Sequence, residues 1–251
     1  MGTFILQKDF ISTDSDIEIM ILKDLLKRER FLYDYIELTK DELSDYKDSE
    51  KIPVGTIDFV ETYLKNTIKG FYRENPIEIP KYLRTDEFLK RDYSIVEYKD
   101  IPTRGKYFIK DVSQLKKFGS VMLNEYDYME INELCDKTHL FQVSSVYDIK
   151  AEYRVYVVAG ELQQISLYNG YATELPDIKL IEKAVNLILY NEKWLKSFTL
   201  DIMVGKEGTA IIEVHNFTSV GLYTTLWGTD LLYAYRDGID YLVNDNKTIE
   251  L

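Results

Sequence analysis

Three residues of the types that bind hard cations or carry protons lie close together near the end of the chain: Asp201, Glu213 and His215. Each carboxylate belongs to a run rich in β-branched and apolar residues, 198–204 for the aspartate and 209–215 for the glutamate. The two runs flank a short segment with a glycine at each end, which is typical of a β-hairpin. The pattern therefore predicts a hairpin with a carboxylate on each strand.

The register of this hairpin decides whether the two carboxylates meet. A three-residue loop, 206–208, places Asp201 directly opposite Glu213, and alternation along the strand puts His215 on the face of Glu213. Like charges placed opposite each other destabilise a sheet, so a positive group is expected between them. Mg²⁺ prefers carboxylate oxygens and fits this position. A slip of one residue would instead leave two separate, solvated carboxylates.

The hairpin resembles the metal-binding end of the ATP-grasp superfamily, whose enzymes join a carboxylate to an amine or thiol through an acyl phosphate. In that family an Asp on the penultimate strand and a Glu on the last strand hold Mg²⁺, and an Asn two residues after the Glu completes the site. Asp201 and Glu213 match this pattern. His215 occupies the Asn position and Asn216 follows it, so the resemblance leaves two candidates for the third metal ligand.

Lysines upstream are candidates for phosphate contacts. Lys110 lies near the end of the strand-like run 106–111, which resembles the family strand whose lysine contacts the α-phosphate and the adenine edge. Lys106 lies four residues earlier, is predicted on the same strand face and is a second candidate. A lysine in an apolar strand is costly to bury without an anion, whereas the alternative is a surface lysine whose amine reaches solvent.

An arginine-bearing strand and the segment before it extend the resemblance. The run Glu152–Leu162 resembles the ATP-grasp strand–turn–strand in which an E-x-R sequence precedes a Gly turn, which implies that Arg154 faces the γ-phosphate or acyl phosphate. Glu152 shares its face and is expected to orient it, and the alternative is a surface ion pair of little worth. The run 141–146 resembles the hinge between lobes, with Gln142 near the base, or is an ordinary core strand.

The family's first cationic position, which holds the β-phosphate, has three candidates here: Arg84, Lys90 and Arg91. Arg91 is the preferred one, and the alternative for all three is a solvated charged face. After the hairpin, Gly221 is expected to allow close approach of a substrate and Tyr223 to line its pocket. The sequence has no Gly-rich phosphate loop, so a nucleotide must be held by side-chain cations, a metal and backbone groups.

The composition restricts the class of protein. The 251 residues include 31 basic and 43 acidic ones, and the net charge of −12 makes a poor general binder of nucleic acid or anionic membranes. No apolar run approaches the length of a membrane span, and the first residues are not expected to be a signal peptide. The single cysteine, Cys135, excludes an internal disulfide framework and fits a reducing compartment, so a cytoplasmic location is expected.

The elements that must position these residues follow from apolar periodicity and turn residues. Strands are predicted at 3–11, 93–98, 106–111, 141–146, 152–158, 161–168, 198–204 and 209–215, with strand-like pieces at 30–38, 53–60 and 77–79; one helix begins at Asp16 and others cover 61–69, 112–118, 131–137, 177–195 and 230–242. Hairpins dominate the middle of the chain, which is typical of an α+β fold. Prolines before residue 85 predict a small α/β N-terminal lobe, residues 1–85, ahead of an ATP-grasp domain, residues 86–251, whose two α+β lobes sandwich the nucleotide.

The resemblance implies an ATP- and Mg²⁺-dependent ligase that joins a carboxylate to an amine, with Lys110 and Arg154 as catalytic residues. The implied nucleotide contacts are Arg91, Lys106, Lys110, Gln142, Glu152 and Arg154, and the candidate metal ligands are Asp201, Glu213, His215 and Asn216. The expected substrates are a small molecule, amino acid, peptide or protein bearing the two groups, and a homodimer is one assembly to consider. Two alternatives stay open: a nucleotide-binding regulatory or assembly module without ligase activity, and a phosphotransferase on the same scaffold.

Overall fold

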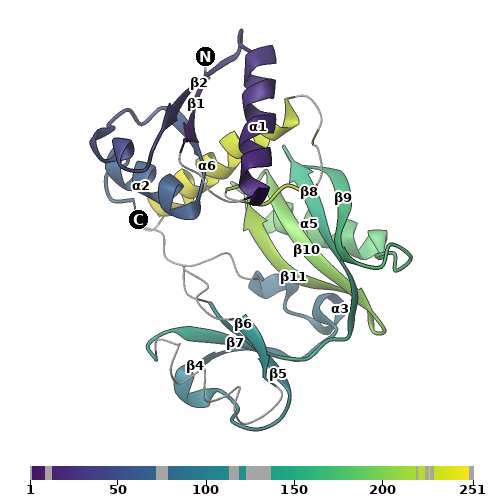
Figure 1. The fold of residues 1–251 in the computed structure, drawn as a ribbon. Coiled ribbons are helices and arrows are strands. Elements are labelled where there is room, and N and C mark those ends of the chain that lie inside the picture. The colour runs from purple at the N-terminus through teal and green to yellow at the C-terminus, as the bar shows by residue number, and fades with distance from the viewer. Residues whose placement is uncertain are drawn as a thin grey trace.

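The computed structural model describes residues 2–8, 13–71, 79–112, 119–122, 137–218, 220–223, 226 and 229–248. Its strands form three sheets that follow one another along the molecule (Figure 1). The N-terminal sheet has three parallel strands, and the other two sheets have four antiparallel strands each. The mixture of helices with mainly antiparallel sheets confirms the predicted α+β class.

The N-terminal sheet has the strand order β2-β1-β3. Its strands are β1 (Gly2–Gln7), β2 (Tyr33–Leu38) and β3 (Lys51–Val54), and its helices are α1 (Thr13–Arg28) and α2 (Ile57–Thr67). The central strand buries three consecutive residues, Phe4, Ile5 and Leu6. Consecutive burial is expected of a parallel strand that is covered on both faces. Residues of α1, of α2 and of the C-terminal helix α6 (Asp230–Thr248) supply that cover in one apolar cluster.

The C-terminal helix therefore returns to the beginning of the chain (Figure 1). Leu231, Leu232 and Tyr235 of α6 share the apolar cluster of the N-terminal sheet. Gly238 allows close packing there, since a Cβ at this position would lie 2.7 Å from the carbonyl oxygen of Phe217. The division of the chain at residue 85 stays a prediction, and α6 from its second segment completes the core of the first.

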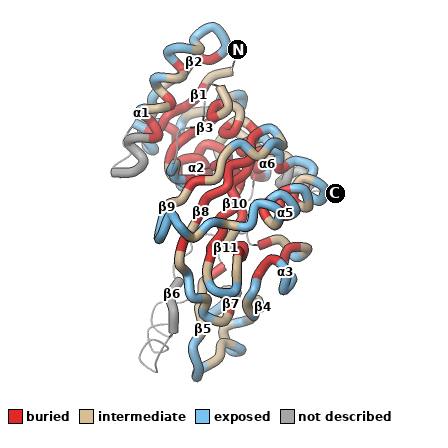
Figure 2. Tube along the Cα trace, turned by 90° about the vertical axis from the view of Figure 1, so that its right-hand side faces the viewer, coloured by how far each residue is buried: buried red, intermediate tan, exposed pale blue. Residues whose placement is uncertain are grey.

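The small sheet has the order β4-β7-β5-β6. Its strands are β4 (Tyr93–Glu97), β7 (Leu140–Ser145), β5 (Tyr107–Asp111) and β6 (Gly119–Met122), and α3 (Asp86–Leu89) precedes it. Short 3₁₀ turns lie at Glu42–Asp45, Lys81–Leu83 and Tyr98–Asp100. Among the described residues its buried apolar cluster consists of Ile109, Phe141 and Val143. Figure 2 accordingly shows fewer buried positions in this sheet than in the one beside it.

The large sheet has the order β11-β10-β8-β9. Its strands are β8 (Ile149–Val158), β9 (Glu161–Gly170), β10 (Phe198–Gly205) and β11 (Gly208–Asn216), and α5 (Ile178–Asn191) lies against it. Val155, Leu200 and Val214 form one row across three strands and pack with α5 in a single core cluster. Because side chains alternate, the next row points to the opposite face, where polar residues are free to form a site.

Most predicted elements are found with shifted ends, and one is wrong. The strand-like piece 53–60 ends at Val54, and α2 begins at Ile57 instead. The reason is Thr56, whose side chain accepts a hydrogen bond from the Phe59 amide and caps the helix. The predicted helices 112–118 and 131–137, most of the extended piece 77–79, and Cys135 lie mostly or wholly outside the described residues. Within the described part, no helix is long and apolar enough to cross a membrane.

Residues 146–148 connect the small sheet to the large one, between β7 and β8. Gly205, at the end of β10, lets this connection pass close by. A Cβ at Gly205 would lie 2.2 Å from the carbonyl oxygen of Asp148 and 2.6 Å from the ring of Tyr147. The lack of a side chain at residue 205 therefore helps to set where the small sheet begins relative to the large one.

We expect Gly205→Ala to lower the free energy of unfolding by about 1–3 kcal/mol, because the added methyl group forces the connection away from β10. Urea denaturation followed by circular dichroism measures the change. The control is Lys206→Ala, at an exposed position of the adjacent turn, which should unfold like the wild type. A Gly205→Ala variant with an unchanged urea midpoint would contradict the close approach.

Candidate functional site

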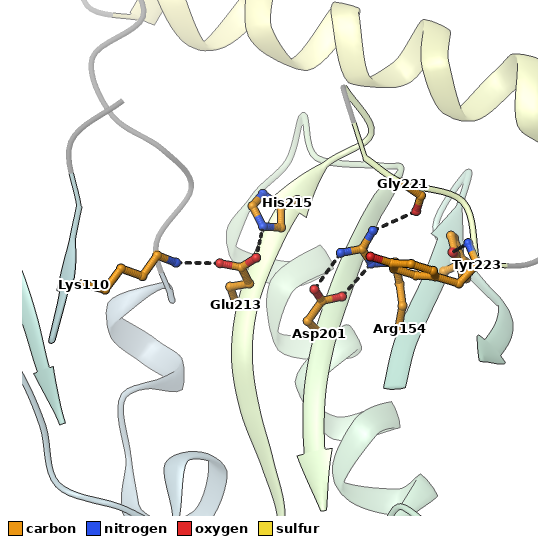
Figure 3. A network of polar contacts seen from close by, with 8 residues as sticks. Lys110, Arg154, Asp201, Glu213, His215, Gly221 and Tyr223 are labelled. Carbon is orange, nitrogen blue, oxygen red and sulfur yellow. Dashed lines mark hydrogen bonds and ion pairs between the residues drawn. The ribbon is translucent and has the colours of Figure 1, made fainter. Parts of the chain in front are cut away.

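A buried ion pair joins two neighbouring strands of the large sheet. Arg154 on β8 is paired with Asp201 on β10, and the two residues are 8% and 3% exposed. The guanidinium donates Nε to Oδ1 and Nη2 to Oδ2, both at 2.7 Å, and Nη1 donates to the Gly221 carbonyl at 2.8 Å (Figure 3). Burial opposes the charge on Arg154, but the hydrogen bonds and the charge of Asp201 outweigh it and raise the pKa of Arg154.

Glu213 on β11 has polar partners on both carboxylate oxygens. Lys110 donates its Nζ to Oε2 at 2.6 Å, and Nε2 of His215 contacts Oε1 (Figure 3). Lys110 belongs to β5 of the small sheet, so its ion pair with Glu213 links the two antiparallel sheets. The side chains of Lys110 and Glu213 are 19% and 17% exposed, so the pair is shielded and still accessible to a ligand.

The predicted pairing of Asp201 with Glu213 is confirmed, but the loop that was expected to produce it is wrong. Gly205 pairs with Gly208, so the loop has two residues rather than three. Ile212 has no pairing partner and forms a β-bulge that shifts the register by one residue. The bulge thus restores the alignment that the shorter loop would have removed.

The positive charge expected beside the two carboxylates is supplied by the protein itself. Arg154 neutralises Asp201, and Lys110 neutralises Glu213. The donor types of Asp201, Glu213 and His215 fit a divalent cation. However, no group of three acidic, His or Cys side chains converges in the part of the chain that the structure describes. A metal could be held here only after the two cations have released the carboxylate oxygens.

Two tyrosines cover the guanidinium of Arg154. Its central carbon lies 4.8 Å from the ring centre of Tyr223 and 5.9 Å from that of Tyr168. The two rings stack on each other, with centroids 4.8 Å apart and planes 18° apart. Burial, followed by the charge of Asp201, raises the pKa of Tyr168, so its phenol stays neutral. The amide of Tyr223 donates to the hydroxyl of Tyr156 at 2.9 Å, which fixes the loop that carries Tyr223.

A cavity of about 180 Å³ lies between the small sheet and the large sheet. Its lining residues are Arg91, Phe108, Lys110, Gln142, Ser144, Ser145, Val146, Tyr147, Ile149, Glu152, Met203 and Ile212. The connection between the sheets closes one side, Phe108 and Met203 provide apolar walls from opposite sheets, and Lys110 places its charge at the lining. The predicted hinge segment, 141–146, therefore does lead from one lobe of the cavity to the other.

Of the three upstream cations, Arg91 lines this cavity, whereas Arg84 lies outside its lining and Lys90 is exposed. Arg91 donates Nη1 to the carbonyl oxygens of Leu89 and Ile211, at 3.0 and 2.9 Å. Burial lowers its pKa to about 10, and no acidic residue pairs with it among the described residues. A shielded cation without a carboxylate partner is suited to an anionic ligand.

Two predicted contacts lie apart from the charge pairs. Lys106 precedes β5, is exposed and does not line the cavity, so the prediction that it shares the strand face of Lys110 is wrong. Asn216 lies one position from the face of Glu213 and is buried. Its side-chain oxygen accepts from Thr218 at 2.6 Å, and its amide nitrogen has no partner within the described segments.

Glu152 lines the cavity but does not orient Arg154, as its E-x-R spacing predicted. Its carboxylate accepts a hydrogen bond from Asn169 at 3.3 Å, across to β9. Asp201 holds the guanidinium instead. The reason is the strand order: Asp201 lies directly beside Arg154 on the next strand, whereas Glu152 is two residues along the same strand.

Sequence reasoning misses Glu18 on α1. This residue is 9% exposed, and its burial raises its pKa to about 8 in spite of the opposing charge of nearby Arg154. The N-terminal helix therefore brings an acidic group towards the arginine of the large sheet. The signal in the sequence is a lone Glu between Ile17 and Ile19, in an otherwise apolar stretch.

Solved structures that are similar in fold include several ligases. D-alanine–D-alanine ligase from Bacillus anthracis, complexed with ATP, is similar with a TM-score of 0.51 and 13% identity over 99% of this chain and 98% of that one. D-alanyl-alanine synthetase A from Vibrio cholerae has a TM-score of 0.60 and 12% identity, covering 95% and 98%. D-cycloserine synthetase has a TM-score of 0.60 and 11% identity, covering 96% and 100%. At such identities the likeness establishes the fold, which is that of the ATP-grasp proteins.

The sequence itself then defines the family. A family of ATP-grasp domains, the second family of its clade, matches residues 88–227, which is more than half of the chain. The protein therefore belongs to this family of ATP-grasp proteins, and the predicted resemblance is confirmed. No curated protein matches the sequence significantly.

The buried Glu18 predicts a pH dependence of stability. The unfolded chain loses this proton near pH 4.5 and the folded chain near pH 8, so the folded state binds more protons between these values. Stability from this group is full below pH 4.5 and is lost as the pH rises towards 8. Glu18→Gln removes the loss, and we expect its advantage over the wild type to grow by roughly 2–4 kcal/mol across this range.

Urea unfolding of both proteins at several pH values between 4 and 8.5 measures this difference. Glu182→Gln, at an exposed position of α5, is the matched control and should follow the wild type. Wild-type and Glu18→Gln curves that stay parallel would show that the carboxyl is not held in its protonated form.

Proposed function

We propose that this protein is an ATP- and Mg²⁺-dependent ligase that joins a carboxylate to an amine through an acyl phosphate. The observation that carries the proposal is the position of two ion pairs, Arg154–Asp201 and Lys110–Glu213, on the face of the large sheet towards the small sheet and its cavity. Membership of an ATP-grasp family and likeness in fold to ligases support it.

The cavity between the sheets is the proposed place of the nucleotide base. Phe108 and Met203 offer apolar surfaces for a flat ring, and Gln142 is a polar side chain within the lining. The backbone at Val146 and Tyr147 lies along the same cavity and can read the edge of the base with its amide and carbonyl groups. Base recognition then falls to the segment that joins the two sheets.

Three cations are the proposed phosphate ligands: Arg91, Lys110 and Arg154. Arg154 uses three of its five N–H groups on Asp201 and Gly221, and the other two have no acceptor among the described residues. They can bind phosphate oxygens without breaking the present bonds. Lys110 would turn from Glu213 to a phosphate, which needs only rotation of its flexible side chain.

Asp201 and Glu213 are the proposed holders of Mg²⁺, with His215 better placed than Asn216 for a third contact, because His215 already touches Glu213. When bound, the metal would act as a Lewis acid on the phosphate oxygens. The protein's own part is electrostatic: once Lys110 contacts phosphate, Glu213 loses its compensating charge and attracts a cation in its place. The negative ligand and the positive ion thus favour each other's binding.

The acid and amine substrates are placed beside Arg154, near Gly221 and Tyr223. Tyr223 is 50% exposed, so its ring is partly available to a ligand. A Cβ at Gly221 would meet the Tyr223 hydroxyl and Arg154 only at 3.7 and 3.9 Å, so this side of the loop is open. Arg154 would stabilise charge as the phosphoryl group passes to the carboxylate, before the amine attacks the acyl phosphate.

The test is isothermal titration with ATP in the presence and absence of Mg²⁺. We expect the wild type to bind ATP only weakly without Mg²⁺, and Glu213→Gln and Asp201→Asn each to lose at least about tenfold in Mg²⁺-dependent affinity, the weight of one charge-assisted contact. Glu207→Gln, in the exposed turn of the same hairpin, should bind like the wild type. Phosphate release with pools of amino acids and peptides then tests turnover.

Wild-type protein that binds no ATP at any Mg²⁺ concentration would refute the proposal. Magnesium-dependent binding without phosphate release for any pool would favour a nucleotide-binding regulatory module. A phosphorylated product in place of an amide, identified by mass spectrometry, would favour a phosphotransferase. Because Asp201→Asn also unpairs a buried arginine, its folding is checked by circular dichroism, and Glu213→Gln decides if that variant unfolds.

A further inference from the structure

Tyr168 reaches Arg154 because of an irregularity in β9. Tyr153 pairs with Leu167, and Glu152 pairs with Asn169, so Tyr168 between them has no partner on β8. An extra residue of this kind is a β-bulge, which bends the strand and changes the direction of its side chain. Bulges cost regular pairing, and they are frequent beside functional sites, where they aim a residue.

The bulged Tyr168 completes an aromatic surface over the guanidinium. Tyr223 arrives from the loop after β11 and stacks on Tyr168 with centroids 4.8 Å apart. Both rings lie within cation–π distance of Arg154, at 4.8 and 5.9 Å. Asp201 and Gly221 meanwhile hold the guanidinium by its edges. The plane of Arg154 is therefore fixed both by hydrogen bonds at its edges and by rings at its face.

We propose that Tyr168 is a positioning residue which, with Tyr223, clamps the guanidinium of Arg154 so that its two remaining N–H groups receive the terminal phosphoryl group of ATP. This inference rests on the proposed nucleotide function and adds a specific role to it: the clamp makes the site distinguish ATP from ADP. The distinction follows because ADP lacks the phosphoryl group that those two donors would meet, while contacts to the base are the same for both nucleotides.

The ring of Tyr168, rather than its hydroxyl, carries this role. The hydroxyl forms no hydrogen bond with any residue in the described part of the chain, whereas the ring contacts both Arg154 and Tyr223. Phenylalanine at position 168 keeps the ring, and leucine removes it at similar volume. This pair of substitutions therefore separates the stacking contribution from polar effects.

The experiment measures ATP and ADP affinities by isothermal titration for wild type, Tyr168→Phe and Tyr168→Leu. We expect the wild type to prefer ATP, Tyr168→Phe to keep that preference, and Tyr168→Leu to reduce the ATP-to-ADP affinity ratio about five- to tenfold, the weight of one shielded cation–π contact. ADP affinity itself should stay unchanged. Tyr190→Leu, 82% exposed on α5, is the control and should match the wild type.

A double-mutant cycle with Arg154→Lys sharpens the test, because lysine lacks the planar group that the rings clamp. In that background Tyr168→Leu should change the ratio no further. Equal weakening of ATP and ADP in Tyr168→Leu, or no change, would overturn the clamp while leaving the nucleotide site in place. A wild type that binds both nucleotides equally would overturn it too. A wild type that binds neither would refute the proposed function, and the clamp with it.

Discussion

Compensation of two neighbouring carboxylates is the constraint on which the rest of this site depends. Asp201 and Glu213 are paired across β10 and β11, where like charges repel. Arg154 compensates the first from within the large sheet, and Lys110 compensates the second from the small sheet. A buried ion pair of this kind adds little to stability, but the loss of one partner is costly. Its main effect is to keep four charged groups in one place.

The two compensating cations differ in how firmly they are held. Arg154 has bonds to Asp201 and Gly221 and two rings against its face, so it belongs to the rigid part of the site. Lys110 has a flexible side chain and belongs to a sheet with a small buried core among the described residues. A ligand that enters between the sheets can therefore displace Lys110 at lower cost than Arg154. This asymmetry suits a nucleotide that is bound and released in each cycle.

Irregularities in the strands aim the site as much as the regular pairing does. The bulge at Ile212 aligns Asp201 with Glu213, and the bulge at Tyr168 turns an aromatic ring towards Arg154. Both are single unpaired residues in long strands, and neither leaves a strong mark in the sequence, since no glycine occupies either position. The correct pairing of the carboxylates follows from an incorrect loop length for this reason.

The sequence by itself determined the α+β class, the two β-rich runs around a turn, and the residue types that carry charge at the hairpin, because alternation and local turn chemistry are properties of short segments. It also carried enough of the ATP-grasp pattern to define the family. Only the tertiary structure decided which partners meet: that Asp201 rather than Glu152 holds Arg154, that Lys106 stays in solvent, and that Glu18 approaches from α1. These outcomes depend on strand order and on packing between segments distant in the chain, which local periodicity does not encode.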